Sequence, residues 1–330
     1  MELSIVILSW NTKELTRNCL RSIFASVKDI DFEVIVVENG SHDGSPEMIE
    51  QEFPQVKLVR NNYNSGFTKG NNQGFKESRG DYILFLNSDT IVPPGDFSPR
   101  SVLGKLPMTD LGDTCSQLRR MLDKMKSDKS IGMLTPKLVY PDGRFQDEYY
   151  RKLPSIIQTF WVYLAPINKL THKIGFLRRR YLSDIDPDKS CYVETFNVPG
   201  AAPMISREAY EKIDGRDENI FYWMEDVDLF WSMKKAGYKM YYLADATIIH
   251  LGGMSNIMWD DLRKMLDFRK GYLYVFRKHK GKFQGFVVKW MFIINAIIMS
   301  PILIVLGIFK RKYFRKGIAA AKFAWKFLSV

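Results

Sequence analysis

The stretch LSIVILS at Leu3–Ser9, closed by Trp10–Asn11, is the part of the sequence that most constrains the fold. A continuous apolar, β-branched run of this length is typical of a strand that is covered on both faces. Similar runs follow at Phe32–Glu38, Val56–Arg60 and Tyr82–Leu86. Segments with helical spacing of apolar residues separate these runs, at Thr12–Ser22, Pro46–Phe53 and Phe67–Ser78. This alternation predicts an α/β fold whose central sheet is mostly parallel and flanked by helices.

The composition excludes several classes of protein. With 330 residues, 46% of them hydrophobic and 26% charged, the chain can bury a sizeable core. Its three cysteines, Cys19, Cys115 and Cys191, are too far apart for a CxxC-type zinc site and too few for a disulfide framework. No GxGxxG follows the first strand and no GxxxxGK[ST] occurs, which disfavours a dinucleotide-binding or P-loop site.

The net charge of +11 is concentrated near the C-terminus, where residues 262–330 hold sixteen Lys and Arg against one acid, Asp267. Within them Trp290–Phe309 has 20 residues without charge, enough to cross the roughly 30 Å of a bilayer core as a helix. Lys289 precedes this run and Lys310–Lys312 follows it, so we expect membrane contact. A single span, a re-entrant hairpin and a buried core helix all fit the pattern.

The middle of the chain is less regular. Thr114–Ser127 has the spacing of an amphipathic helix, and Ile131–Tyr140 that of a strand that ends in a tight turn. Ser155–Ile167 is apolar, aromatic and too short to span a membrane. It fits a core helix, a membrane-dipping segment or a segment that lines an acceptor site.

Polar residues follow the predicted strands. Asn11, Glu38 and Asn87-Ser88-Asp89 each come at a strand's carboxyl end, and parallel strands bring these ends to one edge of the sheet. A carboxylate there, such as that of Asp89, can bind a divalent cation that also contacts a diphosphate. The alternative is that Asn, Ser and Asp only form the turn.

Three further segments could carry chemistry. Glu225-Asp226 begins a helical pattern that stops at Gly237, and a carboxylate in a first helical turn stays ionised and can act as a base. Acids that only cap a helix fit equally. His250 ends an apolar strand and could complete a metal site, although a single histidine is more often structural. The Gly- and Asn-rich stretch Asn62–Gly74 suits close approach to a nucleotide, or is a plain loop.

Taken in order, these motifs resemble inverting glycosyltransferases of family 2, which have the GT-A fold, over about residues 3–255. The matching segments are SIVILSWN, VIVVENGSHDGS, NSGFTKGNNQGF, GDYILFLNSDT, VPGAAPMISREAY and FYWMEDVDLFWSMKKAGY. Within the family, the sequence is most similar to rhamnosyltransferase-type enzymes that build cell-surface polysaccharides on polyprenyl-diphosphate carriers.

The resemblance implies a role for each matching residue. Asp89 and His250 would bind Mg²⁺ or Mn²⁺ with the donor diphosphate, and Asp226 would be the catalytic base with Glu225 beside it. The residues that would contact the donor are Ser9, Asn11, Glu38, Asn39, Asp43, Gly66, Asn72, Asn87, Ser88, Gly200 and Ala201. Two positions depart from the family pattern, because Asn87 replaces the first acid of its DxD motif and Glu38 replaces an Asp that contacts the base.

The resemblance also implies a reaction and partners. A hydroxyl of a lipid-linked or oligosaccharide acceptor would displace the diphosphate of a dTDP- or UDP-sugar, with inversion. Residues 1–260 would be the catalytic domain, and the basic helical region 261–330 would hold it on membrane lipids at the cytoplasmic face; no nucleic acid partner is expected. Two rival functions are a sugar nucleotidyltransferase and a membrane-anchored glycan- or lipid-binding protein without catalysis.

Overall fold

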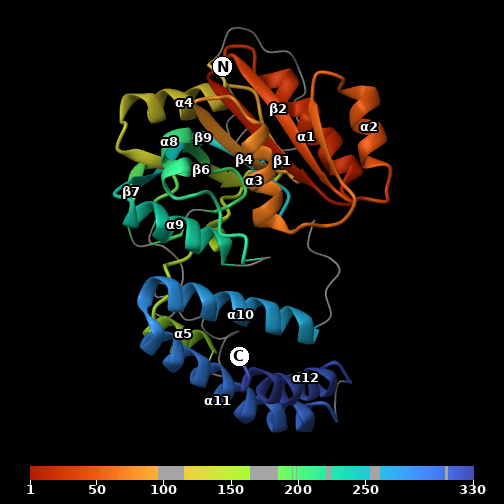
Figure 1. Ribbon diagram of the computed structural model, residues 1–330, viewed down its shortest axis with the longest axis vertical. Helices are drawn as coiled ribbons and strands as arrows, with labels where there is room; N and C mark the ends of the chain where they lie inside the picture. The colour runs from red at the N-terminus through yellow and green to blue at the C-terminus, as the bar shows by residue number, and fades with distance from the viewer. Residues whose placement is uncertain are drawn as a thin grey trace. The chain divides into compact units, whose positions relative to one another are not determined.

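The computed structural model describes residues 1–95, 115–163, 185–194, 196–197, 199–220, 224–252, 261–308 and 311–330 (Figure 1). The chain forms two compact units. The first unit comprises Met1–Tyr150, Ile185–Phe221 and Leu229–Asn256, and the second comprises Arg151–Asp184, Tyr222–Asp228 and Ile257–Val330.

The amino-terminal half of the first unit is a parallel sheet in the order β3-β2-β1-β4. Its strands are β1 (Leu3–Ser9), β2 (Phe32–Asn39), β3 (Lys57–Asn61) and β4 (Tyr82–Asn87). The connecting helices are α1 (Lys13–Ser26), α2 (Ser45–Glu52) and α3 (Phe67–Glu77). The central strands β1 and β4 are buried along almost their whole length. The four predicted strands and three predicted helices are therefore confirmed, with small shifts at their ends.

The other half of the sheet mixes strand directions, in the order β4-β8-β6-β9-β5. Its strands are β5 (Thr90–Ile91), β6 (Ile131–Val139), β7 (Cys191–Val193), β8 (Met204–Ser206) and β9 (Lys239–His250). The strand β8 runs antiparallel to both β4 and β6, so it joins the two halves, and β7 pairs with β9. The result is one nine-stranded mixed sheet.

Helices pack against this sheet with the side chains that the sequence pattern predicts. The helix α4 (Gln117–Ser127) buries Leu118, Met121, Leu122 and Met125 and packs on β6 and β9. Its N-cap is Ser116, whose Oγ accepts a hydrogen bond from the Arg119 N–H. The predicted helix began at Thr114, which lies outside the described residues. The short helix α8 (Arg207–Lys212) follows β8, and Gly237, with φ of +91°, ends α9 (Glu225–Lys235) as predicted.

Part of the Gly-rich stretch serves packing. Gly70 and Gly74 lie one turn apart on α3, and a Cβ at either position would collide with side chains of β1, namely Leu8 and Val6. The helix therefore approaches the sheet closely because these two residues have no side chain. This packing accounts for two of the glycines in Asn62–Gly74 without a ligand.

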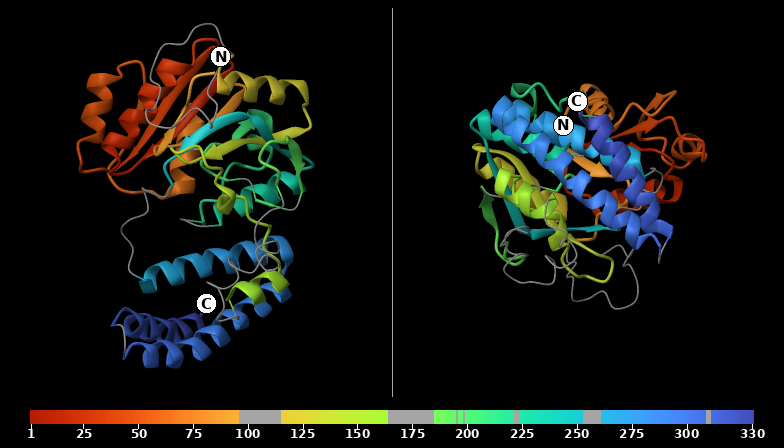
Figure 2. Two further views of the ribbon diagram at one scale, coloured as in Figure 1. Left: turned by 180° about the vertical axis from the view of Figure 1, so that it is seen from behind. Right: turned by 90° about the horizontal axis from the view of Figure 1, so that it is seen from below.

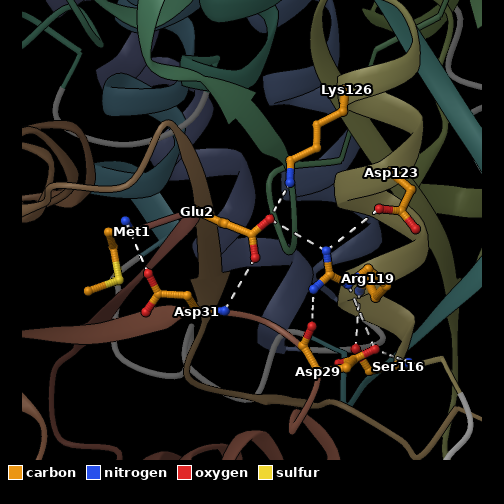
Figure 3. Close-up of polar contacts among 8 residues, drawn as sticks. All are labelled: Met1, Glu2, Asp29, Asp31, Ser116, Arg119, Asp123 and Lys126. Atoms are coloured by element: carbon orange, nitrogen blue, oxygen red, sulfur yellow. Dashed lines mark hydrogen bonds and ion pairs between the residues drawn. The ribbon is translucent and has the colours of Figure 1, made fainter.

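A network of charged groups joins the chain's amino terminus to α4 (Figure 3). Glu2 pairs with Lys126 and with Arg119, and Arg119 in turn contacts Asp29 and Asp123. The hydrogen bond from Lys126 holds the pKa of Glu2 below its ordinary value. Because these side chains are partly exposed, the network adds little stability per pair.

The second unit is mostly helical in the part that the structure describes. It contains α5 (Ile156–Tyr163), α10 (Asp261–Lys280), α11 (Lys282–Leu306) and α12 (Arg311–Phe327). The last three helices lie along one another, as the view from below in Figure 2 shows, and α5 packs on α11. By length and composition α11 could cross a membrane, and it is the one helix among the described residues that could. It runs without a break through Pro301.

Candidate functional site

The sheet brings the predicted polar residues of its first half to one edge. Ser9 lies beside Glu38 in the register of β1 and β2, and Leu8 lies beside Asn87 in the register of β1 and β4. Asn11 follows two residues after the end of β1. The prediction that Asn11, Glu38 and Asn87–Asp89 gather at the carboxyl edge of the parallel strands is therefore confirmed.

The most unusual group at this edge is the carboxylate of Asp89. The side chain is 1% exposed, and neither carboxylate oxygen accepts a hydrogen bond from the residues that the structure describes. A buried carboxylate without compensating partners is costly. Backbone pairing of β5 with the end of β9 places Thr90 opposite His250, and the Leu251 N–H donates to the Asp89 carbonyl. As a result His250 Nε2 lies 3.5 Å from Asp89 Oδ1.

His250 makes a second contact, with Gln146. The Gln146 amide Nε2 donates to the His250 carbonyl at 2.6 Å, and Gln146 Oε1 lies 2.9 Å from His250 Nδ1. Because an amide oxygen can only accept, the Nδ1 of the ring carries the proton. The other ring nitrogen, Nε2, faces the Asp89 carboxylate. Nothing in the sequence pattern singles out Gln146, which is fully buried but follows an ordinary turn.

Asp89 and His250 place a carboxylate oxygen and a ring nitrogen 3.5 Å apart, and both are atom types that can bind a divalent cation. A second-sphere acceptor on the other ring nitrogen, here Gln146, is the usual companion of a metal-binding histidine. No group of three or more His, Cys, Asp or Glu that could hold a metal occurs among the described residues. The remaining coordination positions would come from donor phosphate oxygens and water, as is common for Mg²⁺ and Mn²⁺. The nearby Cys19 is not a thiolate, because burial raises its pKa to about 12.

The loop after β2 is tied by hydrogen bonds to the residues predicted to bind the donor. The Glu38 carboxylate, 1% exposed, accepts from the backbone N–H groups of Gly40 and Ser41 and from the Ser41 hydroxyl. Asn11, in the left-handed region with φ of 53°, accepts from the His42 N–H through Oδ1, and its own N–H donates to Ser41 Oγ. Asn11 is exposed at this edge.

Asp43 links the starts of two helices. It accepts hydrogen bonds from the Lys13 N–H at 2.8 Å, at the start of α1, and from the Ser45 N–H at 3.0 Å, at the start of α2. Partial burial raises the pKa of the Asp43 carboxyl, but the hydrogen bonds from Ser45 and Lys13 outweigh it and lower the pKa below its ordinary value. The carboxylate is thus anionic and placed where the dipoles of both helices favour charge.

Other predicted donor-contacting residues hold the fold around this edge. Ser9 Oγ lies within hydrogen-bond distance of the Thr12 and Thr16 hydroxyls. Asn39 Oδ1 accepts from the Ser65 N–H at 2.9 Å, which fixes the turn before Gly66. Gly66, with φ of +90°, is the N-cap residue of α3.

Asn72 uses its whole side chain for internal contacts. Its Nδ2 donates to the Arg216 carbonyl and to Glu218, and its Oδ1 accepts from the Tyr210 hydroxyl and from the Arg216 N–H. All four hydrogen-bonding positions of the amide are thus taken by residues 210–218. The predicted contact of Asn72 with a donor stays a prediction.

Gly200 and Ala201 lie near the metal-binding candidate. The Asn87 N–H donates to the Ala201 carbonyl at 2.9 Å, so this segment borders the end of β4. Ala201 is 4% exposed, and Ser88, next to Asp89, is 5% exposed. The segment predicted to meet the donor sugar thus adjoins the residue two positions before Asp89.

Glu225 and Asp226 form the first turn of α9, within the stretch Tyr222–Asp228 of the second unit. The residue before them, Met224, has φ of 70°, a conformation that costs energy for a side chain of its size and is frequent at functional sites. Both acids are half-buried. The prediction that Asp226 meets Asp89 and His250 around one pocket stays a prediction.

A second residue that the sequence analysis missed is Asp228, which is also in the first turn of α9 and 3% exposed. Its Oδ1 lies 2.7 Å from His279 Nε2 and 2.9 Å from Lys278 Nζ, both on α10. The acidic cluster Glu225–Asp228 thus contains one member with a clear structural role. Its sequence signal, a third acid in a helical first turn, resembles ordinary capping.

Comparisons with known proteins agree with this arrangement. A family model described as Glycosyl transferase family 2 matches residues 4–170. The Bacillus subtilis glycosyltransferase YfnE is 38% identical over 95 residues, which are 28% of this chain and 24% of that protein. The N-acetylglucosaminyl-diphospho-decaprenol L-rhamnosyltransferase of Mycobacterium tuberculosis is 24% identical over 267 residues, 75% of this chain and 76% of that protein. The chain thus spans about a quarter of the first relative and three quarters of the second.

Solved structures share the fold at low sequence identity. The mannosyltransferase PcManGT from Pyrobaculum calidifontis, in complex with GDP-Man and Mn²⁺, superposes with a TM-score of 0.54 at 14% identity, covering 98% of this chain and 87% of that one. Residues 1–349 of TarS from S. aureus, in complex with UDP, give a TM-score of 0.50 at 14% identity, covering 94% and 73%. The predicted GT-A fold is therefore confirmed, and the chain belongs to glycosyl transferase family 2.

Proposed function

We propose that the protein transfers a sugar from a nucleoside-diphosphate donor to an acceptor hydroxyl with inversion at the anomeric carbon, and that a divalent cation is required. The observation that carries this proposal is the buried Asp89 carboxylate, which has no hydrogen-bond partner among the described residues and lies 3.5 Å from His250 Nε2. A divalent cation would compensate this buried carboxylate, and the donor diphosphate would be a natural third ligand.

In this mechanism Asp226 acts as the base. The acceptor hydroxyl oxygen forms a bond to the anomeric carbon, the bond from that carbon to the diphosphate oxygen breaks, and the hydroxyl proton passes to the Asp226 carboxylate. One displacement inverts the centre. The cation held by Asp89 and His250 would offset the charge that develops on the leaving diphosphate. Glu225 lies next to the base in the same turn, and the dipole of α9 keeps Asp226 ionised.

The carboxyl edge of the parallel strands, called the donor edge from here on, would bind the nucleotide. Asn11, Glu38, Asn39 and Asp43 lie at the ends of β1 and β2, where ligands bind in sheets of this type. The remaining candidates are Ser9, Gly66, Asn72, Asn87, Ser88, Gly200 and Ala201. We infer a dTDP- or UDP-sugar, with rhamnose as the first sugar to test because a relative that spans three quarters of the chain is named as an L-rhamnosyltransferase.

The acceptor that we propose is a polyprenyl-diphosphate-linked saccharide or oligosaccharide used to build a cell-surface polysaccharide. The same relative, named for a decaprenol-linked acceptor, supports this choice. The basic, apolar region 261–330 would hold the enzyme on lipid at the cytoplasmic face. There a lipid-linked acceptor is present at high effective concentration.

The test measures what leaves the donor. Purified protein with Mn²⁺, a dTDP- or UDP-sugar and acceptor should release nucleoside diphosphate, and Asp226→Asn should lower turnover by about 10²–10⁴-fold while donor-induced thermal stabilisation remains. Asp245→Asn, at an exposed position of the first unit, is the matched control and should keep full turnover. Release of pyrophosphate would assign a nucleotidyltransferase instead, and donor binding without any turnover would assign a binding protein.

A further inference from the structure

The helices α11 and α12 form an antiparallel hairpin. Lys289 near the start of α11 donates to the Leu328 carbonyl at 2.9 Å, and Ser300 in its middle donates to the Gly317 carbonyl at 3.0 Å. The rings of Phe292 and Phe327 also meet, with centroids 6.2 Å apart. Residue numbers that rise along α11 thus fall along α12, and the two helices stay in contact over most of their length.

The face of α11 that its neighbours in the unit leave open is apolar. Apart from Lys282 at the first position of the helix, its exposed residues carry no charge: Phe283, Phe286, Trp290, Ile294, Ile297, Ile298, Pro301, Ile302, Ile304, Val305 and Leu306. In the most apolar 18-residue stretch of α11, only 33% of the residues are buried. An exposed apolar stripe of this length marks a surface that binds a partner or a membrane.

The open face of α12 is divided into two stripes. One is apolar, with Phe314, Ile318, Trp325 and Leu328 exposed, and Trp325 is 79% exposed. The other is basic and is formed by exposed residues on the adjacent side of the helix: Arg311, Arg315, Lys322 and Lys326. An apolar stripe bordered by a cationic one is typical of a helix that lies in the plane of a membrane surface.

We propose that the α11–α12 hairpin lies within one leaflet of an anionic membrane and does not span it. If α11 stood across the bilayer, α12 would stand beside it, because the two are packed antiparallel. The basic stripe runs from Arg311 to Lys326, about 22 Å of helix, so most of its cations would then lie within a hydrocarbon core of about 30 Å. Charges at that depth are strongly unfavourable, and snorkelling relieves only those near the ends.

A hairpin that lies in the membrane surface places both the apolar and the basic stripe in a favourable environment. The apolar faces enter the acyl boundary while the cations stay among the headgroups. No Asp or Glu occurs after Asp267, so nothing on the hairpin repels an anionic lipid. A second copy of the chain fits this face poorly, because pairing two hairpins would bring basic stripes toward one another. The inference deepens the attachment in the proposed function and does not depend on the sugar-transfer chemistry.

The first test measures binding of the full chain to vesicles. Vesicles that contain phosphatidylglycerol should bind the protein, and vesicles of phosphatidylcholine alone should bind it much less. Reversal of two cations by Lys322→Glu with Lys326→Glu should weaken binding by at least about tenfold. The control, Lys28→Glu with Lys76→Glu, makes the same charge change at exposed positions of the first unit and should change binding little. Equal binding by both double variants would overturn the proposal.

The second test locates the hairpin in the bound state. In a chain with Cys115→Ser and Cys191→Ser, Arg315→Cys on the basic stripe should react fully with a membrane-impermeant maleimide added outside the vesicles. Ile297→Cys on the apolar stripe, labelled before binding with an environment-sensitive dye, should show a blue shift. Protection of Arg315→Cys until detergent is added would mean that the hairpin crosses the bilayer and would overturn the proposal.

A further outcome assigns the face to another partner. If the chain forms a dimer that Ile294→Asp dissociates, and does not bind anionic vesicles, the occupant is a second copy and the proposal is wrong. Nucleoside diphosphate release with a soluble acceptor is measured on the same variants. Since none of them touches the donor edge, loss of vesicle binding with unchanged release separates a failure of attachment from a failure of the proposed function.

Discussion

Replacing Gln146 by leucine tests whether His250 is held for a metal. The change removes the donor to the His250 carbonyl and the acceptor for His250 Nδ1–H, and both of these groups are buried. Each unsatisfied group costs about 1–3 kcal/mol, so we expect the free energy of unfolding to fall by roughly 2–6 kcal/mol. Loss of the second-sphere contact should also weaken Mn²⁺ binding by about 10–100-fold.

The matched control is Gln117→Leu. Gln117 is a buried glutamine in the same unit that donates to the Pro94 carbonyl and accepts from the Thr247 N–H, three residues before His250. Its loss should destabilise the protein to a similar extent without changing the affinity for Mn²⁺. Urea unfolding gives the free energies, and calorimetric titration with Mn²⁺ in the presence of nucleoside diphosphate gives the affinities. If both variants bind Mn²⁺ equally well, Gln146 does not orient a metal ligand.

Three further results are expected. Asp228→Ala removes the carboxylate that contacts the largely buried His279. Denaturant unfolding should show that the free energy of unfolding falls by about 3 kcal/mol. An unchanged unfolding midpoint would mean that the contacts of Asp228 with α10 do not form. Cys19 should resist alkylation in the folded protein at neutral pH while exposed Cys115 reacts, since burial raises the pKa of Cys19 to about 12 and only the thiolate attacks; mass spectrometry of the labelled peptides decides this. Because Lys126 lowers the pKa of Glu2, the Glu2 carboxylate stabilises the fold above the ordinary carboxyl range and loses that effect as the pH falls through the lowered pKa. Glu2→Gln should therefore lower Tm slightly at neutral pH, because the free energy of unfolding falls by less than about 1 kcal/mol. At a pH below the lowered pKa, thermal unfolding should give the same Tm for both proteins.

The sequence predicts the parallel half of the sheet well because each of its strands is a local signal. The runs at Leu3–Ser9 and Tyr82–Leu86 are largely apolar and end at polar residues. The apolar run and the polar residues that follow it therefore indicate the same strand and the same strand end. The second half has no comparable signal. The strand β8 has three residues and β5 has two, and both exist because of partners far along the chain. Pairings of this kind depend on tertiary context, which a single sequence does not contain.

The residues of the candidate site differ in the same way, because some follow a local sequence signal and others are defined by contacts far along the chain. Asp89 can be picked out because it follows a strong strand signal, whereas the contact between Gln146 and His250 joins residues 104 positions apart. Glycine density in Asn62–Gly74 points equally to a ligand and to helix packing, and Gly70 and Gly74 turn out to face the sheet. Asp228 lies in a run of acids whose members look alike in sequence, and only its contacts with α10 distinguish it.

The small number of protein ligands has a consequence for how donor and cation would bind. Asn87 offers an amide where a second carboxylate would add charge, so Asp89 and His250 alone should bind Mn²⁺ weakly. The donor diphosphate would then supply the missing oxygens. Linkage requires that the cation raise the affinity for nucleotide by the same factor by which the nucleotide raises the affinity for the cation. Substituting Asp89 with asparagine should therefore remove the coupling and leave the weaker, cation-independent binding of the nucleotide at the β1 and β2 edge.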